Sequence, residues 1–301
     1  MSVRSPITGL PHVRLEQEIP SQEIISCYRD QLNIDVGRYF QEVPAIRVYR
    51  CLDTDYRFYA PLGLAADEAF YQELQRFNWY YPSWRWEYAL SKRLISEKEK
   101  VLEIGCGNGA FLELMAAHGI CAEGLETNEK ARVIAQAKGL WVLNTTLQVY
   151  AETYAETADV VCAFQVLEHI AHVREFLASA LKSLKKGGRL LVSVPDNGSV
   201  LRYDRFNALN HPPHHMGLWK AASLRNLAGT CGLSLLNLYY EEIEPAHIEK
   251  SGEAVYQWIE MRYGKAAATL CGIGGTVLKK WVESFPGSVR GMTLLAEYRK
   301  E

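Results

Sequence analysis

The chain has 301 residues, 48% of them hydrophobic and 23% charged, and its formal net charge is −2 at pH 7. This length and composition suit a folded enzyme of one large or two small domains, and the near-neutral charge gives no electrostatic reason to expect a nucleic acid partner. The sequence lacks the run of roughly 18 apolar residues that a membrane helix needs. Its start also lacks the apolar segment of a secretory signal. Seven cysteines without a C-x-x-C pair suit reduced thiols, so we expect a cytoplasmic protein without a membrane span.

Residues 1–95 are predicted to form an accessory region that acts as a lid over a substrate. Nine aromatic side chains gather in its last part. Phe70 and Phe77 have helical spacing, which predicts that they dock this segment onto the sheet formed by the later residues. Tyr81 and Trp84 are candidates for a pocket wall, because aromatic rings combine a rigid surface with a polar group.

Residues 101–109, VLEIGCGNG, are the most informative segment of the chain. An apolar run that contains Glu103 ends in three glycines spaced two residues apart, and a helical pattern follows at once. The segment therefore predicts a strand, a glycine loop and a helix. Glycine is expected in such a loop because it adopts positive φ and lets a ligand approach the backbone.

The next short strand, at residues 121–125, ends in Glu126 and Thr127. A carboxylate at this place can accept hydrogen bonds from both hydroxyls of a ribose. A dinucleotide fingerprint reads G-x-G-x-x-G, whereas this loop reads E-x-G-x-G-x-G. The spacing thus favours an adenosine-type cofactor and disfavours a nicotinamide oxidoreductase, which stays as an alternative.

The segments that follow continue the alternation of strands and helices. Residues 158–164 (ADVVCAF) predict a strand that leads into Gln165 and Val166, and a helical pattern then ends at the basic and glycine residues 185–188. In this order the segments resemble class I S-adenosylmethionine (SAM) dependent methyltransferases. The resemblance extends from residue 100 to about residue 244.

The alternation predicts a parallel α/β sheet, and the resemblance implies the Rossmann-like form, with seven strands and helices on both faces. Residues 96–301 would be the methyltransferase domain. A largely helical insertion at about residues 248–285 would separate the last two strands, which form an antiparallel pair. The strands are predicted near residues 100–104, 121–126, 140–144, 158–163, 188–194, 233–242 and 291–299.

The resemblance also implies that SAM is the cofactor. Glu103 and the glycines would surround its methionyl part, Glu126 would hold the ribose, and the loop after the fourth strand would line the adenine and the sulfonium. The predicted cofactor contacts are Glu103, Gly105, Cys106, Gly107, Gly109, Glu126, Thr127, Phe164, Gln165 and Val166.

The loop after the fifth strand carries His211, His214 and His215 within five residues. A histidine can accept a proton near neutral pH, and this segment resembles, in position, the segment of sugar C-methyltransferases in which a histidine is the base. By that match His215 is the first candidate for the general base and His214 the second. The alternative is that these histidines cap backbone groups or pack against neighbouring rings. The candidate acceptor contacts are Tyr81, Trp84, Arg202, Tyr203 and His211.

We predict no metal site from the sequence. Related sugar methyltransferases carry an N-terminal zinc module with paired cysteines, which Cys27 and Cys51 do not supply. Asp196 and Asn197 resemble the acid pair of magnesium-dependent catechol methyltransferases. Those enzymes also need an acid at the end of the fourth strand, where this chain has none.

Two further motifs have ordinary interpretations. His169 and His172 are predicted to be helix-start residues, with Glu168 adding favourable charge near the helix N-terminus. Residues 210–213 (NHPP) differ from the D/N-P-P-Y/F motif of DNA amino-methyltransferases by an intervening histidine, and they follow the fifth strand rather than the fourth. A nucleic acid acceptor is therefore not expected.

Residues 27–61 resemble the segment that precedes methyltransferase domains of bacterial polysaccharide and natural-product biosynthesis. The resemblance implies O-methylation of a sugar or secondary metabolite, as a small molecule or a glycoconjugate, with a histidine as general base. The alternatives are a sugar C- or N-methyltransferase and a non-catalytic SAM-binding scaffold protein. The residues leave the oligomeric state open, a homodimer included.

Overall fold

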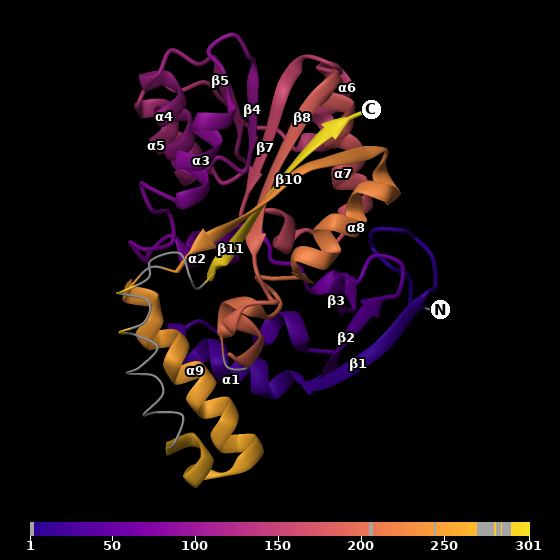
Figure 1. Ribbon diagram of the computed structural model, residues 1–301, viewed down its shortest axis with the longest axis vertical. Coiled ribbons are helices and arrows are strands. Elements are labelled where there is room, and N and C mark those ends of the chain that lie inside the picture. The colour runs from indigo at the N-terminus through magenta and orange to yellow at the C-terminus, as the bar shows by residue number, and fades with distance from the viewer. Residues whose placement is uncertain (1–2, 205–206, 244, 270–279, 281–283, 285–289) are drawn as a thin grey trace.

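The computed structural model describes residues 3–204, 207–243, 245–269, 280, 284 and 290–301. A seven-stranded sheet fills one half of the molecule, and a smaller antiparallel sheet lies in the other half with the N-terminal helix α1 and the long helix α9 (Figure 1). No helix in these ranges is long and apolar enough to cross a membrane.

The large sheet has the strand order β10-β11-β8-β7-β4-β5-β6. Strands β4 to β8 run parallel, whereas β11 pairs antiparallel with both β8 and β10. All seven predicted strands are confirmed, including the antiparallel closing pair. Their bounds are β4 Val101–Ile104, β5 Ala122–Leu125, β6 Val142–Leu143, β7 Ala158–Phe164, β8 Leu184–Pro195, β10 Leu233–Glu242 and β11 Arg290–Lys300.

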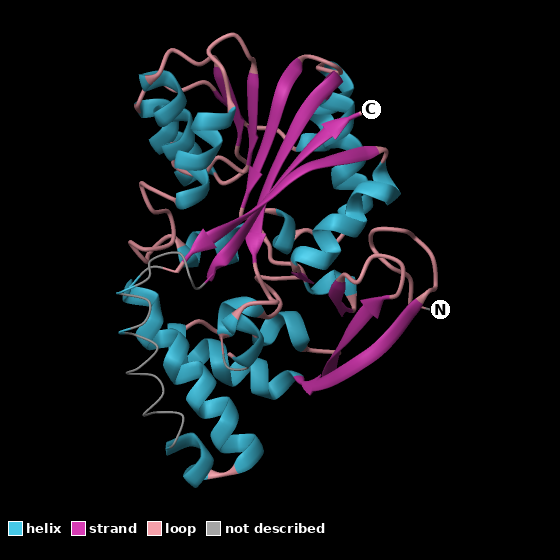
Figure 2. Cartoon of the chain, in the orientation of Figure 1, coloured by secondary structure: helices cyan, strands magenta, loops and turns pink. Residues whose placement is uncertain are grey.

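Helices cover both faces of this sheet, as predicted (Figure 2). Strand β7 shows how alternating side chains serve the two faces. Val160 and Cys162 join the core beneath α3 and α4, whereas Val161 and Ala163 join the core beneath α6, α7 and α8. The helices are α3 Trp86–Leu94, α4 Ala110–Ala117, α5 Glu129–Ala137, α6 Leu147–Thr153, α7 Val173–Ser183 and α8 Ala221–Cys231.

The accessory region folds into a second sheet with the order β1-β2-β3-β9. Its last strand comes from the loop after β8, and Gly217 and Leu218 pair there with Phe58 and Arg57. The two regions divided at residue 95 are therefore interleaved, which the sequence pattern did not indicate. The elements are β1 Val13–Pro20, α1 Ser21–Leu32, β2 Ala45–Cys51, β3 Arg57–Ala60, α2 Glu68–Leu74 and β9 Gly217–Leu218.

The insertion before the last strand is helical where the structure describes it. Helix α9 spans Pro245–Tyr263, and the Trp258 ring lies 4.8 Å from the ring of Tyr203 in the short helix η4, Val200–Tyr203. The rest of the predicted insertion, from residue 270 to residue 285, lies almost entirely outside the described residues.

A buried ion pair joins β8 to β11. Arg189 donates to Glu297 at 2.8 Å and to Glu99 at 2.8 Å, and their side chains are only 16%, 6% and 24% exposed. We expect Arg189→Met to lower the free energy of unfolding by about 3–5 kcal/mol, because Glu297 would lose its cationic partner in the interior. Urea unfolding measures this loss.

The matched control for Arg189→Met is Lys182→Met, which removes a solvent-exposed ion pair with Glu152. It should change the free energy of unfolding by less than about 1 kcal/mol. Equal effects of the two substitutions would contradict the structural role of Arg189.

Candidate active site

A cavity of about 300 Å³ lies where the carboxyl ends of β4, β7 and β8 meet. Open parallel sheets commonly bind ligands at this edge. We call it the glycine-loop cavity, and three segments surround it: the glycine loop 105–108, the aromatic segment 79–88, and the loop that carries His214 and His215. Of the predicted cofactor contacts, Gly105, Cys106, Gly107, Phe164 and Gln165 line it.

The glycine loop has the conformation that its composition predicts. Gly105, Gly107 and Gly109 have φ values of 67°, 52° and 78°, which other residues rarely adopt. A methyl group on Gly107 would lie 2.8 Å from the ring of Tyr81. Gly109 differs, because a methyl group on it would lie 2.5 Å from Leu140 Cδ1 and 3.0 Å from Ala135 Cβ, and the residue is the N-cap of α4. Gly109 thus serves helix packing and lies outside the cavity lining.

Glu126 ties the end of β5 to the glycine loop. Its Oε2 accepts from the Gly107 amide at 2.9 Å and its Oε1 accepts from the Asn128 amide at 2.7 Å. Burial raises the pKa of this carboxyl, and the Asn128 and Gly107 amides oppose the shift. Thr127 beside it is exposed. The carboxylate is therefore held rigidly at the position where a ribose would meet it.

Several buried polar atoms at this edge of the sheet have no hydrogen-bond partner among the described residues. They include Glu103 Oε2, Asn108 Oδ1 and Asn128 Nδ2, and Asn108 lines the cavity. Such atoms are few in folded proteins, and a bound ligand can supply their partners. SAM fits this set, because it carries an ammonium, a sulfonium and ribose hydroxyls that carboxylate and amide oxygens can bind.

Glu103 is 2% exposed, and burial, with the nearby charge of Glu126, raises its pKa to about 8. The carboxyl has its ordinary pKa of 4.5 when unfolded. Because the folded pKa is the higher one, the folded protein loses stability as pH rises from 4.5 through about 8. At pH 9 we expect Glu103→Gln to have a free energy of unfolding about 1–3 kcal/mol above that of the wild type. The variant should therefore unfold at a higher temperature.

At about pH 3.5, below both pKa values, Glu103 is protonated in the folded and in the unfolded state, and the Glu103→Gln variant and the wild type should unfold at similar temperatures. Thermal unfolding at the two pH values measures the difference. A variant that is less stable than the wild type at pH 9 would contradict the burial of an unpaired charge.

The aromatic segment covers the glycine loop. Tyr81 packs on Gly107, and Tyr88 contacts Phe111 and Phe164 with ring centroids 5.5 Å away. Trp84, the other predicted pocket wall, is 57% exposed and does not line the cavity. Phe70 and Phe77 pack in the accessory region's own core rather than on the large sheet, so the predicted docking onto that sheet is wrong.

Three histidines form a cluster across the cavity from the glycine loop. The ring of His169 lies 4.4 Å from that of His214 and 5.0 Å from that of His215, between centroids. Burial lowers the pKa of His169 to about 4 and lowers those of His214 and His215 well below their ordinary value. All three imidazoles are therefore neutral at pH 7, and each offers a lone pair.

Hydrogen bonds decide where these lone pairs lie. Nδ1 of His169 bonds the carbonyl of His214 at 2.7 Å, and Nδ1 of His214 bonds that of Leu209 at 3.0 Å. A carbonyl only accepts, so each Nδ1 carries the proton and each Nε2 the lone pair. Nε2 of His214 accepts from the hydroxyl of Tyr80 at 3.1 Å.

Glu168 is a cavity residue that the sequence interpretation missed. Its side chain is 1% exposed, its Oε2 has no hydrogen-bond partner among the described residues, and burial raises its pKa to about 8. Of the two predicted helix-start residues, His172 is confirmed as the N-cap of α7, whereas His169 lies with Glu168 in the preceding short helix η3, Leu167–His169. No sequence spacing could have joined His169 to residues 45 positions later.

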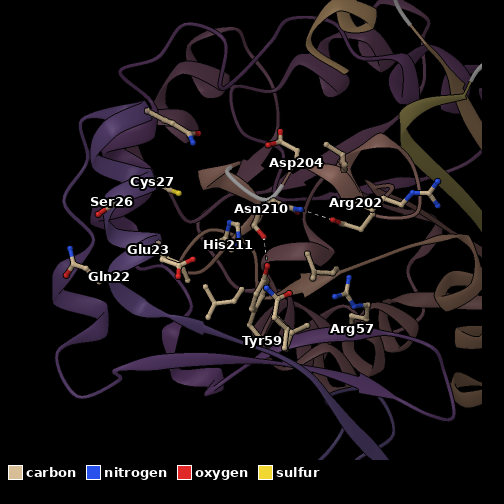
Figure 3. Close-up of a pocket in the computed structure, with 18 of the residues that line it drawn as sticks. Gln22, Glu23, Ser26, Cys27, Arg57, Tyr59, Arg202, Asp204, Asn210 and His211 are labelled. Carbon is tan, nitrogen blue, oxygen red and sulfur yellow. Dashed lines mark hydrogen bonds between the residues drawn. The ribbon is translucent and has the colours of Figure 1, made fainter. Parts of the chain in front are cut away.

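A second cavity, of about 550 Å³, lies between α1, the small sheet and the short helices after β8 (Figure 3). We call it the α1 cavity. Two predicted acceptor contacts, Arg202 and His211, line this cavity rather than the first one. Tyr203 instead packs against the insertion at Trp258. The predicted acceptor contacts are thus spread over two cavities.

Comparisons with known proteins agree with this arrangement. The family described as "Methyltransferase domain" matches residues 81–238, more than half of the chain. The ubiquinone biosynthesis O-methyltransferases of Aliivibrio fischeri (strain MJ11) and Vibrio cholerae (O395) are 32% and 33% identical over 32% and 36% of this chain. The chain matches less than half the length of these relatives, 44% and 47%.

A solved structure shares the fold. The SAM-dependent methyltransferase of Thermotoga maritima, described as a possible histamine N-methyltransferase, superposes with a TM-score of 0.51 at 19% identity. The match covers 78% of this chain and 98% of that one. By family, strand order and glycine loop, the chain belongs to the class I SAM-dependent methyltransferases, and SAM is its cofactor.

Proposed function

We propose that this protein transfers the methyl group of SAM to a hydroxyl oxygen of a small molecule or glycoconjugate, a sugar or secondary metabolite. One observation carries the proposal: the histidine cluster and the glycine loop line the same cavity. The relatives named above, O-methyltransferases of ubiquinone biosynthesis, support an oxygen acceptor. The volume of about 300 Å³ suits a small acceptor or the end of a larger one.

SAM supplies a methyl group on a sulfonium; the acceptor oxygen bonds to this carbon as the carbon–sulfur bond breaks, and S-adenosylhomocysteine leaves. Holding the two reactants in line provides much of the rate in such a transfer. Glu126 and the glycine loop would fix the ribose and methionyl ends, and Phe164 and Gln165 would line the reacting side. Tyr81 would cover the bound cofactor.

The acceptor proton needs a destination in the cavity. His215 is the favoured histidine, because its Nδ1 bonds Asn210 Oδ1 at 3.2 Å, which leaves Nε2 for the acceptor. His214 is the weaker candidate, since its Nε2 already accepts from Tyr80. The lowered pKa makes His215 a weak base by itself, so it orients the hydroxyl better than it removes the proton.

We place this activity in the cytoplasm, in polysaccharide or natural-product biosynthesis, without a nucleic acid substrate. Formation of S-adenosylhomocysteine from SAM, measured with panels of sugars, phenols and amines, tests the proposal. Turnover with hydroxyl acceptors is the expected result. Turnover with amines alone would assign N-methylation, and SAM binding without turnover on any acceptor would favour the scaffold alternative.

A further inference from the structure

The histidine cluster has the composition of a metal site. One ring nitrogen from each of His169, His214 and His215 lies within 4.8 Å of the other two. Among the described residues, this is the grouping of three such side chains close enough to hold one ion. The sequence pattern did not indicate this grouping, because helix α7 and strand β8 separate His169 from the other two histidines.

The hydrogen bonds around the cluster match those of metal-binding imidazoles. A histidine that binds a metal through one nitrogen usually donates its other N–H to a carboxylate, a carbonyl or water. All three histidines donate Nδ1–H to an oxygen: the carbonyl of His214, the carbonyl of Leu209 and the side chain of Asn210. Each Nε2 thereby carries the lone pair that a metal would bind, and that of His214 also accepts from the Tyr80 hydroxyl.

Asn210 is itself held in place. Its amide nitrogen donates to Asn197 Oδ1 at 2.8 Å, and its carbonyl accepts from the Tyr59 hydroxyl at 2.9 Å (Figure 3). The remaining oxygen, Oδ1, therefore faces His215 and fixes that ring's tautomer. These hydrogen bonds fix the orientation of His215, which is typical of a metal site and is not expected of histidines that merely share a loop.

A carboxylate completes the surroundings. Glu168 Oε1 lies 3.9 Å from His169 Nε2, and Oε2 has no hydrogen-bond partner among the described residues although the side chain is 1% exposed. A cation bound by the histidines would give this buried acid a partner.

We propose that His169, His214 and His215 bind one divalent first-row transition metal ion, of the zinc class, through their Nε2 atoms. Imidazole ligands suit such ions better than they suit magnesium or calcium, which prefer oxygen. Three protein ligands leave a fourth position open, which is the pattern of catalytic rather than structural sites. All three histidines line the glycine-loop cavity.

The metal gives the proposed methyl transfer a proton route, and this part of the inference rests on the proposed function. In the metal-bound protein His215 Nε2 would hold the ion, and the acceptor hydroxyl would occupy the fourth position, where the cation lowers its pKa. Its proton would leave to solvent water. The oxygen then bonds to the methyl carbon while the carbon–sulfur bond breaks.

Metal content tests the site without any acceptor. The full-length protein is stripped with a chelator, titrated with Zn²⁺ or Co²⁺, and assayed by elemental analysis and by the visible spectrum of Co²⁺. We expect one equivalent in the wild type, little in His169→Ala and His215→Ala, and one equivalent in His172→Ala. His172 is a matched control because it is 66% exposed and outside the cluster.

Two subtler variants sharpen the assignment. Asn210→Leu should weaken metal binding about 10–100-fold through loss of the support to His215. Tyr80→Phe should tighten it, because it removes the hydroxyl that occupies Nε2 of His214; weaker binding would contradict that nitrogen as a ligand.

The inference would be overturned if the wild type took up no metal, or if His169→Ala and His215→Ala took up as much metal as the wild type. The proposed function would still stand if the stripped protein formed S-adenosylhomocysteine at the full rate. Circular dichroism and SAM binding verify that each variant is folded.

Discussion

Replacing Gly107 by alanine is expected to lower the affinity for SAM about 100-fold. Gly107 has a φ of 52°, where a side chain costs about 1–2 kcal/mol. The added methyl would also lie 2.8 Å from the Tyr81 ring, which must move, at a cost of about 1–3 kcal/mol. Together these costs amount to about 3 kcal/mol and favour other loop conformations, in which the Gly107 amide no longer reaches Glu126. Because each 1.4 kcal/mol corresponds to a tenfold change in affinity, the loss is about 100-fold.

Gly119→Ala is the matched control for this substitution. Gly119 also has a left-handed φ, 69°, but a methyl there meets nothing within 4 Å. It should therefore lower the free energy of unfolding and leave the SAM affinity unchanged. If calorimetry gave both variants the same SAM affinity, the glycine loop would not be the cofactor site.

His215→Ala is expected to lower the rate of methyl transfer about 10²-fold, because the acceptor hydroxyl loses the ring that orients it. The SAM affinity should stay within about threefold of the wild type, because the ring lies across the cavity from the glycine loop and receives the acceptor. Single-turnover formation of S-adenosylhomocysteine, with SAM binding measured separately, resolves the two effects.

Because His215 is buried, a second variant is needed to distinguish loss of the imidazole from loss of the fold. His215→Gln keeps a polar atom near the position of Nε2 and fills most of the space, so it should fold and still be slow. His172→Ala, on the exposed turn before α7, should have wild-type rates. Full activity of His215→Gln with an intact fold would remove His215 from the reaction.

The sequence predicted the large sheet well because its strands are short apolar runs between helical patterns. The glycine spacing and Glu126 predicted the cofactor side of the cavity, because these residues lie in one segment of nine residues and at the end of the next strand. The small sheet was not predicted, since β9 is only Gly217–Leu218 and pairs with a strand about 160 residues earlier.

The acceptor side was predicted only in part, because it depends on tertiary contacts. His169 and Glu168 lie in the short helix η3 before α7 and line the cavity. The residues around η3 do not predict that His214 and His215 lie beside it. The three clustered histidines of the sequence are divided by the fold, with His211 in the α1 cavity and His214 in the glycine-loop cavity. Proximity in the sequence therefore grouped His211 with the other two histidines wrongly, and it did not reveal that His169 lies beside them.

Calorimetric titration of SAM into the wild type and into Glu126→Ala tests the central claim most directly. Glu126 bonds two backbone amides and stands where the ribose would bind. We predict tight binding by the wild type and a loss of about 2 kcal/mol in the variant, the scale of hydrogen bonds to a charged group. Failure of the wild type to bind SAM, or equal affinity of the variant, would contradict the placement of the cofactor at the glycine loop.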